Sequence, residues 1–209
     1  MRAPAGIEVI AGVDVAEARK GLDVVLMDRE RTVVWHGGRL RLDEAVAAIL
    51  GATPVLVCID SPPAWGTSGG SRLAERELAR LGVSAFCTPV DPGPHPFYAW
   101  MRAGFALFDA LAGPYPRYRS GDVTGRALEV FPAATAAIVA GQPRPRDVSK
   151  VVFRRGVLAA AGVASAVPLP NIDRVDAALA ALTGVLALEG RSCALGDPDE
   201  GVIVVPALS

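Results

Sequence analysis

The sequence predicts a single α/β domain, residues 1–209, built on a mixed five-stranded sheet that is flanked by helices. Three observations support this fold class. The first apolar segments follow one another at the spacing of β-hairpins, a later segment is apolar along almost its whole length, and helical patterns fill most of the remaining chain. A chain of 209 residues is also long enough for one domain with a substantial core.

The predicted strands are rich in β-branched and apolar residues. In chain order they are IEVIAGVDVA (7–16), LDVVLMD (22–28), RTVVWHGG (31–38), PVLVCIDSPP (54–63), RALEVFP (126–132) and a short closing strand, GVIVVP (201–206). The first three follow at hairpin spacing, which predicts an antiparallel meander. The fourth is a nearly continuous apolar run, so we expect it to be covered on both faces, as strands are inside a parallel sheet.

Helical spacing of apolar residues occupies the segments between and after these strands. The predicted helices span 42–50, 71–82, a longer segment beginning near Pro96, 133–141, 149–162 and 173–188. In the helix that begins near Pro96, six apolar residues follow the spacing of one buried stripe. The residues of this stripe, which we expect in the core, are Phe97, Trp100, Met101, Phe105, Phe108 and Leu111.

The order of the elements narrows the topology. It runs three strands, a helix, a strand, helices, a strand and helices, which is not the regular alternation of a Rossmann sheet. The order fits a sheet in which the first three strands are antiparallel, while the fourth and fifth lie parallel to the first on its other side. This is the architecture of ribonuclease H.

Composition places the chain among ordinary globular proteins and limits its chemistry. Hydrophobic residues make up 51% and charged residues 21%, and no apolar run reaches the roughly 18–20 residues of a membrane span. The N-terminal segment is too brief for a signal peptide, so we expect a cytoplasmic protein without a membrane partner. With three cysteines and two histidines, a zinc site or a histidine-based triad has few residues to draw on. Hydrolytic chemistry would therefore depend on carboxylates.

Five acidic residues lie where the predicted topology would gather them. Asp14 ends the first strand, Asp60 ends the fourth, and Glu129 lies in the fifth. Parallel strands present their carboxyl ends at the same sheet edge, so we expect these side chains to meet there. Asp173 and Asp176 stand about one turn apart on one face of the last helix, which needs only to pack across that edge to join them.

Each of these acids also has an ordinary structural explanation. Asp14 can cap the turn after its strand, Glu129 can pair with Arg126, and Asp173 can be a helix N-cap. Together they favour a metal site, because carboxylates held in contact repel one another unless a cation lies between them. Mg²⁺ and Mn²⁺ prefer oxygen ligands, and paired ions can activate a water and stabilise the leaving oxygen of a phosphodiester.

With these residues identified, the chain resembles the domain-of-unknown-function family 429 (DUF429), whose members are described as predicted nucleases of the RNase H-like fold. The matching pieces, in the family's order, are GVDVA (12–16), IDSPPAW (59–65), RLAERELARLG (72–82), EVFPAA (129–134), DRVDAALAALTG (173–184) and GVIVVP (201–206). They span nearly the whole chain. The segment 173–182 also resembles the aspartate-bearing C-terminal helix of bacterial Holliday-junction resolvases, which belong to the same fold superfamily.

The resemblance implies a metal-dependent phosphodiesterase that acts on nucleic acid. Its catalytic residues would be Asp14, Asp60, Glu129, Asp173 and Asp176, of which Asp14, Asp60 and Asp176 would bind Mg²⁺ or Mn²⁺. Arg72 falls in the family's arginine–acid stretch, where it would contact a phosphate or pair with a neighbouring acid. The sequence does not distinguish DNA from RNA as the substrate.

A basic segment suggests a second way to hold nucleic acid. Residues 114–155 contain eight basic and three acidic residues, although the net charge of the chain is -1. Arg117 and Arg119 can bind phosphates of a substrate. Tyr115 and Tyr118 can stack on bases, or the segment is a solvated loop whose tyrosines fold back on the core. A non-catalytic binding module of the same fold is therefore an alternative to a nuclease.

A third interpretation is a nucleotide-binding enzyme of the actin and sugar-kinase type. The glycine-rich stretch WGTSGGSR (65–72) precedes a predicted helix, where backbone amides can hold phosphate. The stretch lacks the lysine of a P-loop and the spacing of GxGxxG. Such enzymes also resemble two copies of the fold, and 209 residues supply one.

Overall fold

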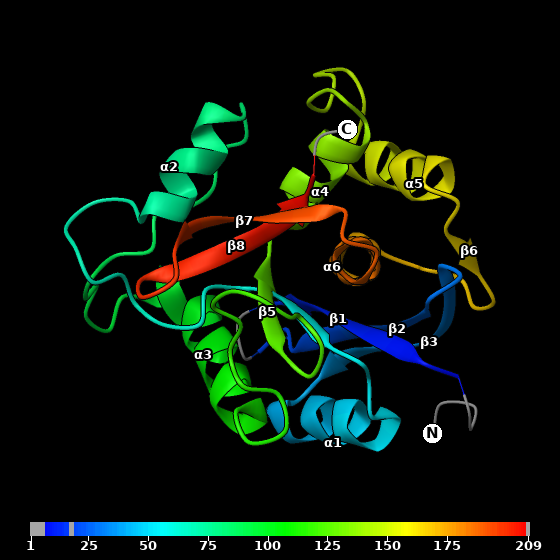
Figure 1. The fold of residues 1–209 in the computed structure, drawn as a ribbon, viewed down its shortest axis with the longest axis horizontal. Helices are drawn as coiled ribbons and strands as arrows, with labels where there is room; N and C mark the ends of the chain where they lie inside the picture. The colour runs from blue at the N-terminus through cyan, green and yellow to red at the C-terminus, as the bar shows by residue number, and fades with distance from the viewer. Residues whose placement is uncertain (1–6, 17–18, 208–209) are drawn as a thin grey trace.

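The computed structural model describes residues 7–16 and 19–207, which fold into a mixed sheet with helices on both faces (Figure 1). The strands are β1 (Val9–Val15), β2 (Leu22–Asp28), β3 (Thr32–Leu40), β4 (Val57–Asp60), β5 (Ala127–Val130), β6 (Ala164–Ser165), β7 (Ser192–Asp197) and β8 (Gly201–Pro206). Within the described ranges they form a sheet of eight strands in the order β6-β3-β2-β1-β4-β5-β8-β7.

The centre of the sheet follows the predicted strand directions. β1 pairs antiparallel with β2, and β2 pairs antiparallel with β3. On the other side of β1, β4 lies parallel to it, and β5 continues parallel to β4.

The prediction of five strands is wrong. β8 extends the sheet parallel to β5, β7 forms an antiparallel hairpin with β8, and β6 lies beside β3. β6 has two residues and is too short to leave a sequence pattern. β7 shows no apolar alternation because none of its residues is buried.

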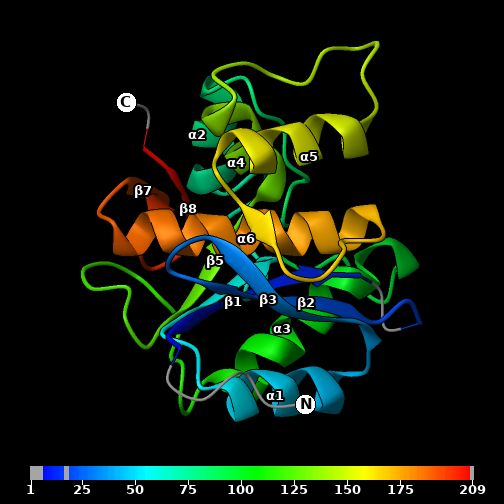
Figure 2. The ribbon, with the colours of Figure 1, turned by 90° about the vertical axis from the view of Figure 1, so that its right-hand side faces the viewer.

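The helices form unequal layers on the two faces of the sheet (Figure 2). They are α1 (Leu42–Ala52), α2 (Leu73–Arg80), α3 (Ala99–Leu111), α4 (Pro132–Val139), α5 (Lys150–Ala160) and α6 (Ile172–Leu188), and a 3₁₀ turn, η1 (Pro96–Tyr98), precedes α3. α6 lies along one face with α4 and α5 on its outer side, α1 and α3 cover the other face, and α2 packs against β7 and β8. No helix in the described ranges has the length and apolar content needed to cross a membrane.

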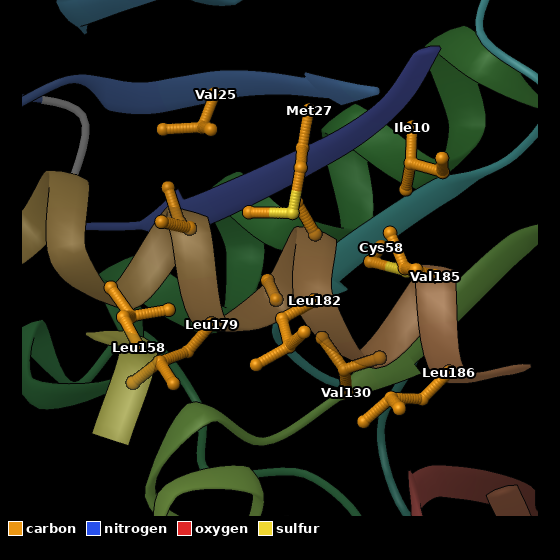
Figure 3. Packing of buried hydrophobic residues seen from close by; sticks show 14 of the residues in the cluster. Ile10, Val25, Met27, Cys58, Val130, Leu158, Leu179, Leu182, Val185 and Leu186 are labelled. Carbon is orange, nitrogen blue, oxygen red and sulfur yellow. The ribbon is translucent and has the colours of Figure 1, made fainter. Parts of the chain in front are cut away.

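α6 is enclosed on all sides for most of its length. Residues 175–187 are all buried, and Figure 3 shows apolar side chains of this helix beside Met27 and Cys58 of the sheet. The contact with β1 is especially close, because a Cβ added at Gly12 would overlap the carbonyl oxygen of Ala177. The backbones of β1 and α6 are therefore in direct contact.

The apolar stripe predicted for the helix that begins near Pro96 is only partly buried. Its buried members are Met101, Phe108 and Leu111. Phe97 is 46% exposed, and Trp100 and Phe105 are only partly buried. Phe97 lies in η1, before the α-helix begins, so helical spacing does not place it on the buried face.

Gly12→Ala is expected to destabilise the protein, because the added methyl group must displace the backbone of α6. The free energy of unfolding should fall by about 2 kcal/mol or more, as is typical of overpacking a tight core. Gly51→Ala on α1 is the matched control, since a Cβ at Gly51 meets no atom within 4 Å. Urea unfolding followed by circular dichroism measures both variants. Equal stabilities would contradict the close contact between β1 and α6.

Candidate functional site

Two carboxylates stand side by side at the carboxyl ends of β1 and β4. The parallel register pairs Asp14 with Asp60, two residues beyond the pair of Gly12 with Cys58. Because side chains alternate along a strand, both acids lie on the same face as Gly12 and Cys58, which contact the α6 layer. Neighbouring strands are about 4.8 Å apart, so the two side chains are adjacent.

A third carboxylate, which the sequence reasoning missed, continues this row. Asp23 on β2 pairs with Asp14 across the antiparallel ladder, so three acids lie on one face of β2, β1 and β4. Asp23 is buried, and Arg174 Nε lies 3.2 Å from its Oδ1 as an ion pair without hydrogen-bond geometry. Gly38 leaves room for this pair, because a Cβ there would overlap both groups. Burial raises the pKa of Asp23 despite this partner. The register of the predicted hairpin alone would have identified this residue.

α6 carries two more acids to the same place. Asp173 lies one turn before Ala177, the residue that contacts β1, and Asp176 directly precedes Ala177. Asp173 is not the helix N-cap, because Asn171 has that position and its Oδ1 accepts a hydrogen bond from Arg174 N at 3.1 Å. One cavity of about 1090 Å³ is lined by all five aspartates, Asp14, Asp23, Asp60, Asp173 and Asp176.

The two adjacent acids of β1 and β4 are poorly neutralised by the protein. Burial, followed by repulsion from Asp60 and Asp176, raises the pKa of Asp14 well above its usual range. Burial and repulsion from Asp176 raise the pKa of Asp60 to about 7, against the attraction of Arg154 and Lys150. Among the described residues, neither carboxylate accepts a hydrogen bond or forms an ion pair. The pair is therefore a favourable place for a bound cation.

Asp176 differs from this pair because α5 neutralises it. Lys150 Nζ lies 2.9 Å from Asp176 Oδ2, and Arg154 forms an ion pair with Asp176 Oδ1. Both bases come from the first half of α5, which packs against α6. The basic segment of the sequence thus reaches the site through these two residues, whose role the sequence reasoning did not identify.

The acids suit a divalent cation in their chemistry but do not form a complete coordination shell. All of them offer carboxylate oxygens, which Mg²⁺ and Mn²⁺ prefer. In the part of the chain that the structure describes, no group of three or more His, Cys, Asp or Glu side chains is arranged to hold a metal ion. Asp14 and Asp60 are without a paired cation there. Both oxygens of Asp176 are already paired with bases, Oδ2 with Lys150 and Oδ1 with Arg154.

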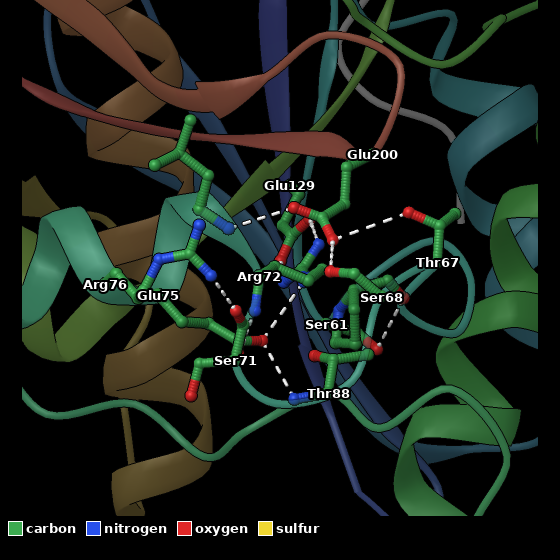
Figure 4. Close-up of polar contacts among 12 residues, drawn as sticks. Ser61, Thr67, Ser68, Ser71, Arg72, Glu75, Arg76, Thr88, Glu129 and Glu200 are labelled. Atoms are coloured by element: carbon green, nitrogen blue, oxygen red, sulfur yellow. Dashed lines mark hydrogen bonds and ion pairs between the residues drawn. The ribbon is translucent and has the colours of Figure 1, made fainter.

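Glu129 does not belong to this cluster. It pairs with Ile59 in the ladder, so its side chain points to the opposite face of the sheet from the acid row. Its carboxylate accepts hydrogen bonds from both terminal nitrogens of Arg72, at 2.9 and 2.6 Å, in the network of Figure 4. Arg72 Nε also donates to Glu75 at 3.0 Å. The partner of Glu129 is therefore Arg72 and not Arg126.

None of the three arginines expected to bind phosphate lines this cavity, although Arg72 lines a smaller cavity that includes Asp60. Arg72 is 2% exposed, and two carboxylates hold its guanidinium. Arg119 is exposed and pairs with Asp199 at 3.2 Å. Arg117 is partly buried, and its Nη2 has no hydrogen-bond partner among the described residues. The basic side chains that do line the cavity are Arg19, Lys20, Arg39, Arg41, Lys150 and Arg154.

Contacts in two loops bear on the alternative interpretations. Tyr115 is buried, and its hydroxyl donates to Pro54 O at 2.8 Å, so this tyrosine folds back on the core. The helix after the glycine-rich stretch is already capped by an anion. Leu73 N donates to Glu200 Oε2 at 2.9 Å, and Ser68 Oγ donates to Glu200 Oε1 at 3.1 Å (Figure 4). A carboxylate at this end of α2 disfavours a phosphate there.

Comparison with known protein families gives a match over most of the chain. A family model described as "Protein of unknown function (DUF429)" matches residues 12–200. This chain belongs to the DUF429 family. Every acid that lines the cavity of this DUF429 protein lies within the matched range. Comparisons with curated proteins and with solved structures find no match.

In the metal-free DUF429 protein, Asp60→Asn is expected to raise stability at pH 8. A carboxyl group with a raised pKa binds its proton more tightly in the folded chain than in the unfolded chain. Its ionisation between about pH 4 and 7 therefore lowers the free energy of unfolding. Asparagine removes this cost, so the variant should gain on the order of 2 kcal/mol at pH 8 and little at pH 4.

Chemical unfolding in EDTA at the two pH values measures this difference. Asp147→Asn is the control, because Asp147 is exposed in the connection between α4 and α5. An Asp60→Asn variant that is less stable than the wild type at pH 8 would show that the protein itself satisfies this carboxylate.

Proposed function

We propose that this DUF429 protein hydrolyses phosphodiester bonds in nucleic acid with the help of Mg²⁺ or Mn²⁺. The observation that carries the proposal is the register of Asp14 and Asp60, two adjacent carboxylates that line a large cavity. Neither forms an ion pair or a hydrogen bond with a described side chain. Such a pair is costly to hold ionised, and a divalent cation offsets that cost.

The proposal includes an RNase H-like fold. Its support is the central strand order β3-β2-β1-β4-β5, in which the first three strands are antiparallel and the last two are parallel to β1. β6, β7 and β8 are then additions at the edges of the sheet. The acids of β1, β4 and α6 lie where this topology would gather a metal site.

The residues divide the proposed chemistry between them. Asp14 and Asp60 would hold the metal, with Asp176 as a third ligand and Asp173 in support on the same helix. A divalent ion there would supply Lewis-acid chemistry and lower the pKa of a bound water. Asp23 is already paired with Arg174, so it would not bind the metal itself. Its negative charge would instead favour a cation at the neighbouring acids.

The other side chains of the cavity suit a polyanion. Basic residues enter it from the β1–β2 connection, from the end of β3 and from α5. Lys150 and Arg154 would become available to contact a phosphate once Asp176 exchanges them for metal. A local group of cations attracts phosphates even on a chain whose net charge is -1.

A non-catalytic binding module is the second candidate, and the ion pairs of Asp176 favour it. If Lys150 and Arg154 neutralise the acids permanently, the basic residues alone would hold nucleic acid or a partner protein. A nucleotide-binding phosphotransferase or ATPase has less support, because Glu200 occupies the helix end where a phosphate would bind. Metal binding separates the first two candidates.

The nuclease proposal predicts metal-dependent cleavage that requires the adjacent acids. Labelled single-stranded, duplex and branched DNA and RNA are incubated with the protein in Mn²⁺ and in EDTA. The wild type should cleave at least one substrate in Mn²⁺ only. Asp14→Asn and Asp60→Asn should each slow cleavage about a hundredfold or more, because metal-ion stabilisation of the transition state is worth several kcal/mol.

Two controls make this result specific. Asp147→Asn, which changes an exposed acid outside the cavity, should cleave like the wild type. Mn²⁺ should raise the Tm of the wild type but not that of Asp14→Asn. Cleavage that survives both ligand substitutions would rule out this site, and tight metal-independent binding without cleavage would favour the binding module.

A further inference from the structure

Four aromatic side chains line the cavity of the acids. Phe131 packs against an apolar cluster, and neither the core nor the proposed metal chemistry uses the other three. Phe86 is 65% exposed, Phe97 is 46% exposed, and Trp100 is partly buried. All three line the cavity that contains the acid row, and we name them the aromatic wall. Phe86 and Trp100 also line a smaller cavity that includes Asp60. The aromatic wall therefore stands beside the proposed metal ligands.

Ring contacts hold the aromatic wall together. Phe86 meets Phe97 edge to face with 5.3 Å between ring centroids, and its centroid lies 6.5 Å from that of Trp100. Tyr98 contacts Phe97 at 5.0 Å and Trp65 at 6.1 Å, again edge to face. Pairs of this geometry are stabilising. The exposed rings are thus positioned before any ligand binds.

The loop that carries Phe86 is also anchored through its backbone. Thr88 N donates to Glu75 Oε1 at 2.9 Å, in the buried network of Figure 4. Gly66 N donates to Pro89 O at 2.9 Å, on the other side of Thr88 in the chain. Exposed apolar surface on an anchored loop is unfavourable in water unless it has a binding partner.

The charges of the cavity identify the chemistry of that partner. Cationic side chains of Lys20 and Arg39 line the same cavity as the aromatic wall, and so does Arg41, whose guanidinium pairs with Asp43 at 2.6 Å. A ligand that satisfies both has flat apolar rings joined to anionic groups. Nucleic acid has this combination, since its bases offer π faces and its backbone offers phosphates.

We propose that the aromatic wall stacks on an unpaired nucleobase, which makes single-stranded or unpaired nucleic acid the substrate of this site. The inference rests on the proposed function for nucleic acid as the ligand. Inside a duplex both faces of each base are covered by neighbouring bases, so Phe86 has no face to contact. An unpaired base has a free face, and its flanking phosphates lie against the cations of the cavity.

The test measures binding separately from cleavage. Fluorescence anisotropy of a labelled short oligothymidine is recorded in EDTA with the Asp14→Asn protein, because both the substitution and the absence of metal should suppress hydrolysis. In this Asp14→Asn background, Phe86→Leu keeps an apolar side chain but removes the π face, so it should weaken binding about fivefold or more. Phe86→Trp in the same background keeps a π face and should bind with the affinity of the protein that has Phe86. Leu50→Ala, an exposed apolar position at 38% on α1 outside the cavity, should leave binding unchanged.

A second ligand separates stacking from phosphate binding. An oligonucleotide of the same length with abasic residues keeps the phosphates, so it should bind equally to Asp14→Asn proteins with and without Phe86→Leu. A blunt duplex should be similarly insensitive to the substitution. Circular dichroism and thermal unfolding verify that each variant is folded.

Three results would overturn the base-stacking site. The first is equal oligothymidine affinity with and without Phe86→Leu. The second is a loss of affinity for the abasic strand, caused by Phe86→Leu, that equals the loss for oligothymidine. The third is no binding of oligothymidine at all. Failure of the nuclease proposal has a different signature. In that case binding still depends on Phe86 and on the bases, while the wild type cleaves no substrate in Mn²⁺.

Discussion

The close contact between α6 and β1 determines where the acids of the site lie. Gly12 admits the backbone of the helix at Ala177, and Gly184, further along the helix, contacts Ile10, so α6 runs against the direction of β1. Asp14 is two residues beyond Gly12 on the same strand face, and the acids of α6 come before Ala177. The two sets are therefore displaced from the contact in the same direction and meet. A larger side chain at the contact would separate helix and strand, and the acids with them.

Cations within the site are distributed unevenly among these acids. Arg174 pairs with Asp23, and two bases of α5 pair with Asp176. Asp14 and Asp60 form no ion pair with a described residue, and burial together with repulsion from Asp176 raises the pKa of both. Acids kept only for structure would be expected to be paired, because an uncompensated buried charge is costly. Asp14 and Asp60, which the parallel register makes adjacent, are therefore the two acids of the row without a paired base in the described ranges. This uneven pairing is the physical basis of the metal proposal.

Parts of the site that depend on local sequence patterns could be predicted, and parts that depend on contacts between distant segments could not. Strand directions follow from hairpin spacing and apolar runs, which is why the acids of β1, β4 and α6 were expected at one sheet edge. Glu129 was expected with them because strand order was predicted without register, and a shift of one residue reverses the face. Asp23 was identifiable from its hairpin and was overlooked. Lys150 and Arg154 reach the site through the packing of α5 on α6, a tertiary contact that no local pattern encodes.

Because of the strand register, Glu129 lies on the other face of the sheet from the acid row, where it stabilises a nearby loop. A chain of buried contacts runs from Glu129 through Arg72 and Glu75 to the backbone of Thr88, two residues after Phe86. Removing one member would leave a buried charge without its partner, so the chain resists change. It ties the loop of the aromatic wall to β5, while the packing of α6 on β1 places the acids on the other face. Side chains alternate between the two faces along β4 and β5, so Asp60 lies in the acid row and Glu129 lies on the opposite face. There, Glu129 helps to hold the loop of the aromatic wall in place.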